Sequence, residues 1–330
     1  MKKFTALALA VLLAVTLFAG CASDGGGSGS DTLTIGVSMP TLGNAFFVGM
    51  LMGIEEGVRM HGAEIVTLNA NGDVALQTSQ VEDLITQGVD AIIICPIDSD
   101  AIVTAQQMVI DAGIPLVYCD RGASAPGYDS FVATDNVAMG ALGADLIADF
   151  LTERYGSPTG KVVELQGLIG TSAARDRGDG FNNRVDSQYP GMDIIARQPG
   201  DFNQETSLNV MQNIIQANPE IDAVFTHNDD NALGVLRAIE GAGLLRSPGD
   251  PDYIFIVGID GISDAIMEIR AGNIAVTISQ DPIGMGITAV GFAIDVINGE
   301  SVPVSFDQPH YPIDASNAND TNHWGIAAGD

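Results

Sequence analysis

From residue 33 onward, short runs of Val, Ile and Leu alternate with longer segments whose apolar residues recur every three to four positions. Continuous apolar runs are typical of parallel strands buried on both faces, and the longer segments have the spacing of amphipathic helices. Strands are predicted at 33–39, 64–70, 91–96, 115–120, 131–134, 161–167, 192–197, 223–228, 253–260 and 275–280. Helices are predicted near 46–60, 74–87, 100–112, 136–154, 172–188, 203–217, 229–242, 262–271 and 282–298. The strands fall into two series, so the predicted fold class is α/β, with two doubly wound parallel-sheet lobes.

The amino-terminal stretch has the pattern of an export signal. Two lysines follow Met1, and residues 4–18 are apolar apart from two threonines. This stretch is shorter than the roughly 20 residues that a membrane-spanning helix needs. We therefore predict a secretory signal over residues 1–20, and its end resembles a bacterial lipoprotein cleavage site with Cys21 as the lipidated residue. The predicted location is extracytoplasmic, in the periplasm or on the outer face of the cell membrane, with a Gly/Ser-rich tether over residues 21–31.

The charge of the chain excludes one class of partner. The formal net charge is −29, and loss of residues 1–20 would remove two lysines and no acidic residue, which gives −31. A surface this acidic repels phosphates, so nucleic acid is not a predicted partner. Beyond residue 20 the basic residues are Lys161 and ten arginines. An arginine within a local motif is therefore informative.

Polar residues follow the predicted strands at the positions where a ligand would bind. In open parallel sheets the binding crevice lies at the carboxyl ends of the strands, and two lobes facing each other share one cleft. Side chains that donate and accept hydrogen bonds suit sugar hydroxyls, and aromatic rings suit the C–H faces of a sugar. The candidate ligand-binding residues are Asn44, Phe46, Phe47, Asp120, Arg121, Arg175, Phe202, Asn228, Asp260 and Gln280.

Each candidate also has a purely structural interpretation. Asn44 would be a turn residue, Phe202 a core residue and Gln280 part of the hinge. Arg175 has acidic neighbours with which it would pair on a helix surface. Asp260 and Asn228 stand where they would cap the following helices, and the adjacent phenylalanines 46 and 47 point in different directions from a helix.

Two cysteines end predicted strands of the first series. Cys95 and Cys119 would lie about 4.8 Å apart on neighbouring strands. A disulfide and a pair of buried thiols are both compatible with this arrangement. The sequence leaves the two alternatives open.

The chain shows no motif of a catalytic or metal site. The four histidines have no paired zinc-type spacing, and no Gly-x-Ser-x-Gly elbow, phosphate loop or dinucleotide-binding glycine motif is present. No metal and no cofactor is predicted. The sequence therefore indicates a binding protein and not an enzyme.

Several stretches together carry a family resemblance. They are residues 44–48 (NAFFV), 98–101 (DSDA), 114–121 (IPLVYCDR), 135–136 (DN), 164–175 (ELQGLIGTSAAR), 208–213 (LNVMQN) and 257–261 (VGIDG). On these residues the sequence resembles the periplasmic ribose-binding protein group of ABC-transporter substrate-binding proteins, over nearly all of the chain beyond the signal.

The resemblance implies an architecture and partners. Two lobes joined by three strands would close over a sugar, with residues 31–134 and 281–308 in one lobe and residues 135–280 and 309–330 in the other. The implied ligand is a ribose-like monosaccharide, and the implied partner is a membrane ABC permease served by a lipid-anchored monomer. Allose, xylose and galactofuranose are alternative ligands. A receptor for a chemotaxis or two-component sensor is the alternative function.

Two features depart from the family pattern. Cys95 stands where ribose binders have an asparagine, and a thiol is a weak hydrogen-bonding group, so one contact to the sugar would be lost or replaced. The segment from residue 315 to 330, which contains Trp324, has no counterpart in the resemblance.

Overall fold

The computed structural model describes residues 32–328, which contain two six-stranded sheets. The first sheet has the strand order β11-β5-β4-β3-β1-β2, with every neighbouring pair parallel. Its strands are β1 (Thr34–Met39), β2 (Glu64–Asn69), β3 (Ala91–Ile94), β4 (Leu116–Cys119), β5 (Ser130–Thr134) and β11 (Ser305–Gln308). Strands β3 and β4 are buried along their whole length, as continuous apolar runs predict.

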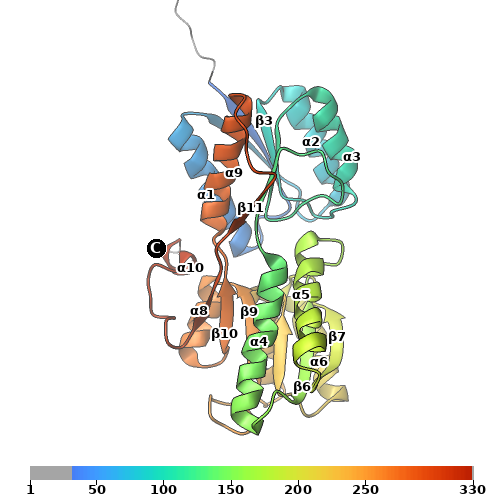
Figure 1. The fold of residues 1–330 in the computed structure, drawn as a ribbon, viewed down its shortest axis with the longest axis vertical. Helices are drawn as coiled ribbons and strands as arrows, with labels where there is room; N and C mark the ends of the chain where they lie inside the picture. The colour runs from blue at the N-terminus through green and yellow to red at the C-terminus, as the bar shows by residue number, and fades with distance from the viewer. Residues whose placement is uncertain (1–31, 329–330) are drawn as a thin grey trace, which may run out of the picture. The chain divides into compact units, whose positions relative to one another are not determined.

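Helices cover both faces of the first sheet (Figure 1). They are α1 (Ala45–His61), α2 (Val74–Gln87), α3 (Ile102–Ala112) and α9 (Pro282–Ile297). Alternate residues of a strand point to opposite faces, so in β3 Ile93 packs with the α1 and α9 core while Ile92 and Ile94 pack with α2 and α3.

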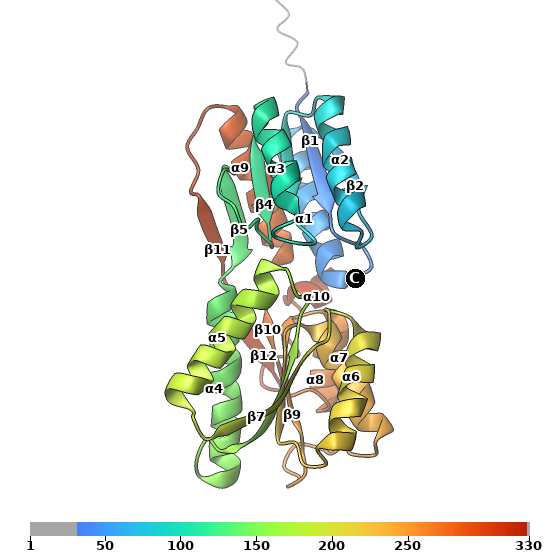
Figure 2. The ribbon, with the colours of Figure 1, turned by 90° about the vertical axis from the view of Figure 1, so that its right-hand side faces the viewer.

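The second sheet has the strand order β12-β10-β9-β8-β6-β7. Its strands are β6 (Gly160–Gln166), β7 (Met192–Pro199), β8 (Ala223–Thr226), β9 (Phe255–Asp260), β10 (Val276–Ser279) and β12 (Tyr311–Asp314). Helices α4 (Asn136–Tyr155) and α5 (Ser172–Gln188) pack on one face. Helices α6 (Gln204–Ala217), α7 (Asp229–Gly241) and α8 (Ser263–Ala271) pack on the other (Figure 2). A last short helix, α10 (Trp324–Ala327), follows β12.

The architecture confirms the predicted class of two α/β lobes, with one difference in strand direction. Strand β12 pairs antiparallel with β10, whereas every other pairing in the second sheet is parallel. The apolar pattern did not predict β11 or β12 as strands. Both are short edge strands, and residues 305–307 of β11 are exposed, so they lack the continuous apolar run of a central strand.

Several helices begin with a side chain that caps the first turn. The capping oxygen accepts a hydrogen bond from a backbone N–H two or three residues later, which satisfies a donor that the helix leaves unpaired. The capping residues are Asn44, Asp73, Asp135, Thr171, Asn203, Asn228 and Asp281.

Both cysteines of the described region are free thiols. Cys95 and Cys119 directly follow and end neighbouring strands, and both are buried. The sulfur of Cys119 lies 3.3 Å from the sulfur of Met50. Of the two alternatives left open by the sequence, the structure has the buried thiols. The predicted lipid site at Cys21 lies outside residues 32–328.

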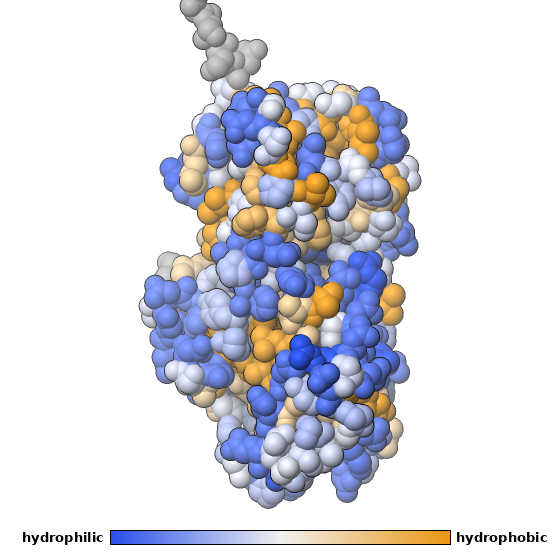
Figure 3. Space-filling view, viewed as in Figure 1, coloured by the Kyte–Doolittle hydropathy of each residue, from blue (hydrophilic) through white to orange (hydrophobic). Residues whose placement is uncertain are grey.

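Membrane-spanning helices are absent from residues 32–328, because no helix there combines sufficient length with sufficient apolar character. On the face drawn in Figure 3, hydrophilic residues predominate and hydrophobic ones form small groups.

Close contact between α1 and α9 depends on glycine. A Cβ at Gly53 would lie 2.1 Å from the carbonyl oxygen of Ile283, and a Cβ at Gly286 would lie 2.4 Å from that of Met50. The facing atoms are backbone, so the two helices would have to separate to accommodate a methyl group.

We expect Gly53→Ala to lower the free energy of unfolding by about 3 kcal/mol or more, because of this overlap. The matched control is Gly291→Ala, within α9, where a Cβ would meet no atom within 4 Å. It should leave stability unchanged or raise it by about 0.5–1 kcal/mol. Urea unfolding measures both variants, and equal effects would contradict the predicted close approach.

Candidate functional site

One cavity lies where the carboxyl ends of strands from both sheets come together. All but one of the residues predicted to bind ligand line it, and its volume is about 20 Å³. The lining residues are Asn44, Phe46, Phe47, Asp120, Arg121, Ala173, Arg177, Phe202, Asn228, Asp260 and Gln280. The set combines carboxylates, guanidinium groups, amides and aromatic rings.

Two of the lining residues also begin helices. Asn44 accepts a hydrogen bond from the backbone N–H of Phe46 and donates to Asp230 Oδ2 at 2.5 Å. Asn228 accepts from the N–H of Asn231, and its Nδ2 lies 3.4 Å from Asp260 Oδ2. The structural and the functional interpretations of these asparagines are therefore compatible, because one oxygen caps the helix while the amide nitrogen is directed elsewhere.

Arg121 lies between aromatic rings from the two halves of the cavity. Its guanidinium carbon is 5.0 Å from the ring centre of Phe47 on α1 and 5.1 Å from that of Phe202, which follows β7. Its Nε is 3.6 Å from Asp120 Oδ2. A cation within about 6 Å of an aromatic ring is attracted by it, so the two rings and the carboxylate together hold a charge that is only 6% exposed.

The arginine of helix α5 that lines the cavity is Arg177, whereas the structure places the predicted Arg175 outside the lining. Arg175 has a side chain that is 55% exposed and pairs with Asp176 at 2.9 Å. Arg177 is buried and donates to Asn136 Oδ1 at 2.7 Å and to the backbone oxygen of His227 at 2.5 Å. Its Nη1 also lies 3.9 Å from Asp260 Oδ1.

The sequence contains a signal that distinguishes the two arginines. Helix residues three and four positions apart share a face, and Arg177 shares its face with Ala173, Ala174 and Phe181. All three are buried. Reading the apolar face of the predicted helix would have selected Arg177 and, with it, the cavity residue Ala173.

Strained backbone is concentrated at this cavity. Asp120, Phe202 and Asp260 have φ values of 68°, 55° and 131°. Residues with a Cβ rarely adopt positive φ, and such strain persists only where the surroundings enforce it. The fold therefore holds these three side chains in fixed directions.

Burial dominates the electrostatics of the cavity carboxyls. It raises the pKa of Asp120, although the nearby Arg121 and Arg177 act in the opposite direction. Burial likewise raises the pKa of Asp260 well above its usual value, against the attraction of Arg177. Burial also lowers the pKa of the Arg177 guanidinium.

A cluster of polar side chains around the buried Glu164 lies behind Arg177. The carboxylate of Glu164 on β6 accepts from Arg197 Nε at 2.6 Å and lies 3.0 Å from His227 Nε2. Burial acts to raise the pKa of Glu164, but the bonds from His227, Arg197 and Asn182 outweigh it and the pKa lies below the usual value. Burial lowers the pKa of His227. The contact with Glu164 holds His227, just after β8, in place. The backbone oxygen of His227 accepts the hydrogen bond from Arg177.

Cys95 does not line the cavity, but it lies behind one of the lining carboxylates. Its sulfur is 3.8 Å from Asp120 Oδ2, and its side chain is 1% exposed. Two lining residues retain buried atoms without a hydrogen-bond partner: Arg121 Nε and Gln280 Oε1.

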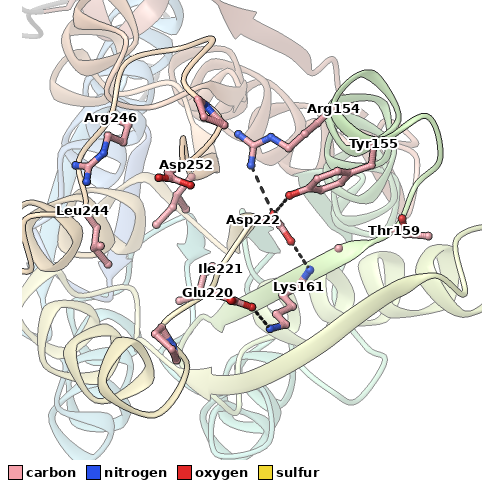
Figure 4. Close-up of a pocket in the computed structure, with 14 residues that line it drawn as sticks. Arg154, Tyr155, Thr159, Lys161, Glu220, Ile221, Asp222, Leu244, Arg246 and Asp252 are labelled. Carbon is pink, nitrogen blue, oxygen red and sulfur yellow. Dashed lines mark hydrogen bonds and ion pairs between the residues drawn. The ribbon is translucent and has the colours of Figure 1, made fainter.

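A larger hollow of about 650 Å³ has a different character (Figure 4). Its basic side chains are already occupied: Lys161 pairs with Glu220 at 2.6 Å and Arg154 with Asp222 at 3.5 Å. Arg246 donates to backbone oxygens of its own loop. The hydroxyl of Tyr155 donates to Asp222 as well. The cavity between the sheets is therefore the better candidate, since it retains unpaired hydrogen-bonding atoms.

Comparison with protein families identifies this arrangement. The sequence model of the "Periplasmic binding protein domain" matches residues 35–301. The chain belongs to the periplasmic binding protein family. Membership confirms the predicted resemblance and the prediction of a binding protein in place of an enzyme.

Relatives with known names agree with this assignment. The ribose import binding protein of Bacillus subtilis is 40% identical over 84% of this chain and 85% of its own length. The fold is similar to that of a periplasmic solute binding protein of an ABC transporter from Actinobacillus succinogenes with bound D-allose. That structure has a TM-score of 0.78 and 30% identity, over 87% of this chain and 99% of the other.

A second structure, a carbohydrate transporter solute binding protein from Agrobacterium radiobacter in complex with D-arabinose, has a TM-score of 0.82 and 28% identity. It covers 90% of this chain and 98% of the other.

Asp229, the first residue of α7, holds the loop after Asp260 in place. Its carboxylate accepts from the N–H groups of Gly261 at 2.8 Å and Ile262 at 3.0 Å, and from the Thr277 hydroxyl at 2.6 Å. Burial raises the pKa of Asp229 to about 7. The folded protein then keeps a proton that the unfolded chain releases near pH 4, so the contribution to stability is full below pH 4 and is lost as pH rises through 7.

We expect Asp229→Asn to remove this pH dependence. Between pH 4 and pH 7 the unfolding free energy of the native protein should fall relative to that of the variant. The difference should change by at most about 1.4 kcal/mol per pH unit. Urea unfolding across this range measures it. The control is Asp111→Asn, an exposed change of equal charge. Parallel stability curves for the native protein and Asp229→Asn would refute the raised pKa.

Proposed function

We propose that this chain is the extracytoplasmic substrate-binding component of a monosaccharide ABC importer and that it binds a ribose-like sugar in the cavity between its two sheets. The observation that carries the proposal is the cavity lining. It places two carboxylates, two guanidinium groups, three side-chain amides and three aromatic rings around one space. The relatives that carry a sugar or a sugar transporter in their names support the same ligand class.

The lining groups match the chemistry of a sugar. Asp120 and Asp260 would accept hydrogen bonds from hydroxyl groups, and Arg121 and Arg177 would donate to hydroxyl oxygens, because each hydroxyl both donates and accepts. The unpartnered Arg121 Nε and Gln280 Oε1 offer one further donor and one further acceptor. Aromatic rings such as Phe47 would pack on the C–H face of the sugar.

Access to the cavity requires movement. Its volume of about 20 Å³ leaves room for about one water molecule, whereas a pentose has ten non-hydrogen atoms. We propose that a lobe of residues 31–134 with 281–308 opens and closes against a lobe of residues 135–280 with 309–330. Sugar that contacts both lobes would shift the population toward the closed form.

The identity of the sugar depends on more than the lining residues. Cys95 replaces the asparagine of ribose binders, and its sulfur lies against Asp120. A thiol supports a carboxylate more weakly than an amide does, so ribose leads the proposal and allose, xylose and galactofuranose follow it.

Export and anchoring complete the proposal. Residues 1–20 would direct export, and lipid on Cys21 would hold the protein at the membrane next to its permease. One acyl chain gives only marginal binding, so stable attachment needs more than one.

The chain without residues 1–21 retains the whole compact unit that begins at Thr32. A monosaccharide panel led by D-ribose should raise its thermal midpoint by several degrees, because a ligand at 100 times its Kd adds about 2.7 kcal/mol. A scan of thermal unfolding measures this shift. If no sugar of the panel moves the midpoint, the proposed ligand class is wrong.

Two arginines of one helix make a matched pair of variants. Arg177→Lys should weaken sugar binding by about 100-fold, because lysine keeps the charge but loses the fork that donates in two directions. Arg175→Ala, on the exposed side of α5, should leave the affinity within about twofold. Titration calorimetry with the stabilising sugar compares them, and the reverse order of effects would place the site elsewhere.

In the chain of residues 1–330 we expect Cys21→Ser to move the protein from the membrane fraction to the soluble fraction, because no thiol remains at the predicted lipidation site. Ser23→Ala is the control and should stay with the membrane. Cell fractionation followed by detection of the protein measures both. A membrane-bound Cys21→Ser variant would contradict lipid anchoring at this residue.

A further inference from the structure

The segment after β12 belongs to one of the two proposed lobes but does not line the cavity. It runs from residue 315 to residue 328 and ends in α10. In Figures 1 and 2, α10 lies beside the start of α1 and next to α8, between the two sheets. One of its residues, Trp324, contacts two residues that line the cavity.

The segment is fastened to the second sheet and its helices. Arg270 of α8 donates to the backbone oxygen of Ala318 at 2.8 Å, and Ala318 is 1% exposed. The ring of His323 stacks on Tyr311 of β12, and its nitrogens lie 3.2 Å from the Tyr311 hydroxyl and 2.9 Å from the Asn317 backbone oxygen. These contacts place the next residue, Trp324, at a defined position.

Trp324 contacts two residues of the cavity from behind. Its Nε1–H donates to the backbone oxygen of Asp260 at 2.8 Å, and its ring meets the ring of Phe46 edge-on at 6.2 Å between centres. The same Asp260 oxygen accepts from the N–H of Gln280 at 3.1 Å. Asp260 and Gln280 border the second sheet, whereas Phe46 belongs to α1 of the first.

The fit around Trp324 is close. A Cβ at Gly49 of α1 would lie 2.9 Å from Cζ3 of the tryptophan, and a Cβ at Gly325 would lie 2.3 Å from the backbone oxygen of Gly261. The indole is therefore held against both α1 and the loop after Asp260. Asp260 itself has a φ of 131°, a conformation that only enclosing contacts keep in place.

We infer that Trp324 is a positioning residue of the sugar site. It fixes the Asp260 carbonyl, and with it the direction of the Asp260 carboxylate, and it supports the Phe46 ring from the opposite half of the cavity. Because it touches both halves, its contacts exist in full only when the halves meet. The inference rests on the proposed sugar-binding function and adds the carboxyl-terminal segment to the machinery of that site.

The chain contains a single tryptophan, so its fluorescence reports on this position alone. A sugar that raises the thermal midpoint should also change the emission of Trp324, with the same Kd in both measurements, because contact with Phe46 and Gly49 excludes water from the indole. A sugar that stabilises the protein without changing the emission would overturn the inference while leaving the proposed function intact. If no sugar stabilises the protein, the proposed function itself fails.

Variants separate positioning from simple packing. Trp324→Ala should weaken the stabilising sugar about tenfold, from the lost hydrogen bond and ring contact. Trp324→Phe keeps a ring against Phe46 and should recover part of this loss; it also provides the test if Trp324→Ala does not fold. Ile326→Ala, a change in the same short helix at a partly buried residue, is the control and should keep the affinity within about twofold.

Calorimetric titration of the native protein and the three variants gives the affinities. If Trp324→Ala and Ile326→Ala lose the same amount of sugar affinity, Trp324 only packs and does not position the site. An unchanged affinity in Trp324→Ala would also refute the inference.

Discussion

The burial of Arg177 is the constraint on which the rest of the structure depends. A buried guanidinium is tolerated only if its charge is paired and its N–H groups are hydrogen-bonded. Arg177 donates hydrogen bonds to the side chain of Asn136, where α4 begins, and to the backbone oxygen of His227, after β8. The carboxylate of Asp260, at the end of β9, pairs with its charge. Three elements must therefore meet at one point, and that point is the wall of the cavity.

Several residues serve both the fold and the site. Asn44 and Asn228 cap helices with one atom and face the cavity or its border with another. Asp229 secures the loop after Asp260, and Trp324 reaches the same loop from the end of the chain. A substitution that changes ligand preference at these positions would therefore also change stability.

Much of this protein can be predicted from its sequence because the relevant physics is local. Continuous apolar runs reveal buried parallel strands, and the rule that ligands bind at strand ends then selects residues such as Asp120, Asp260 and Gln280. The family resemblance adds the pairing of two lobes, and the structure brings those side chains to one cavity. The division into moving lobes and the lipid on Cys21 remain predictions.

Only the tertiary structure decided what depends on orientation and distant contacts. The apolar face of α5 already indicates that Arg177 is buried, but only the fold brings Arg177 to the side chain of Asn136 and the carboxylate of Asp260. Close backbone contact at Gly140 and Gly180 sets how α5 lies against α4. Residues 311–314 form strand β12 because they pair with the free edge of β10. Trp324 gains its role from a residue 64 positions away. The sequence by itself determined the elements and the kind of chemistry, since periodicity and residue type are local properties, whereas contacts between distant segments form only when the chain is folded.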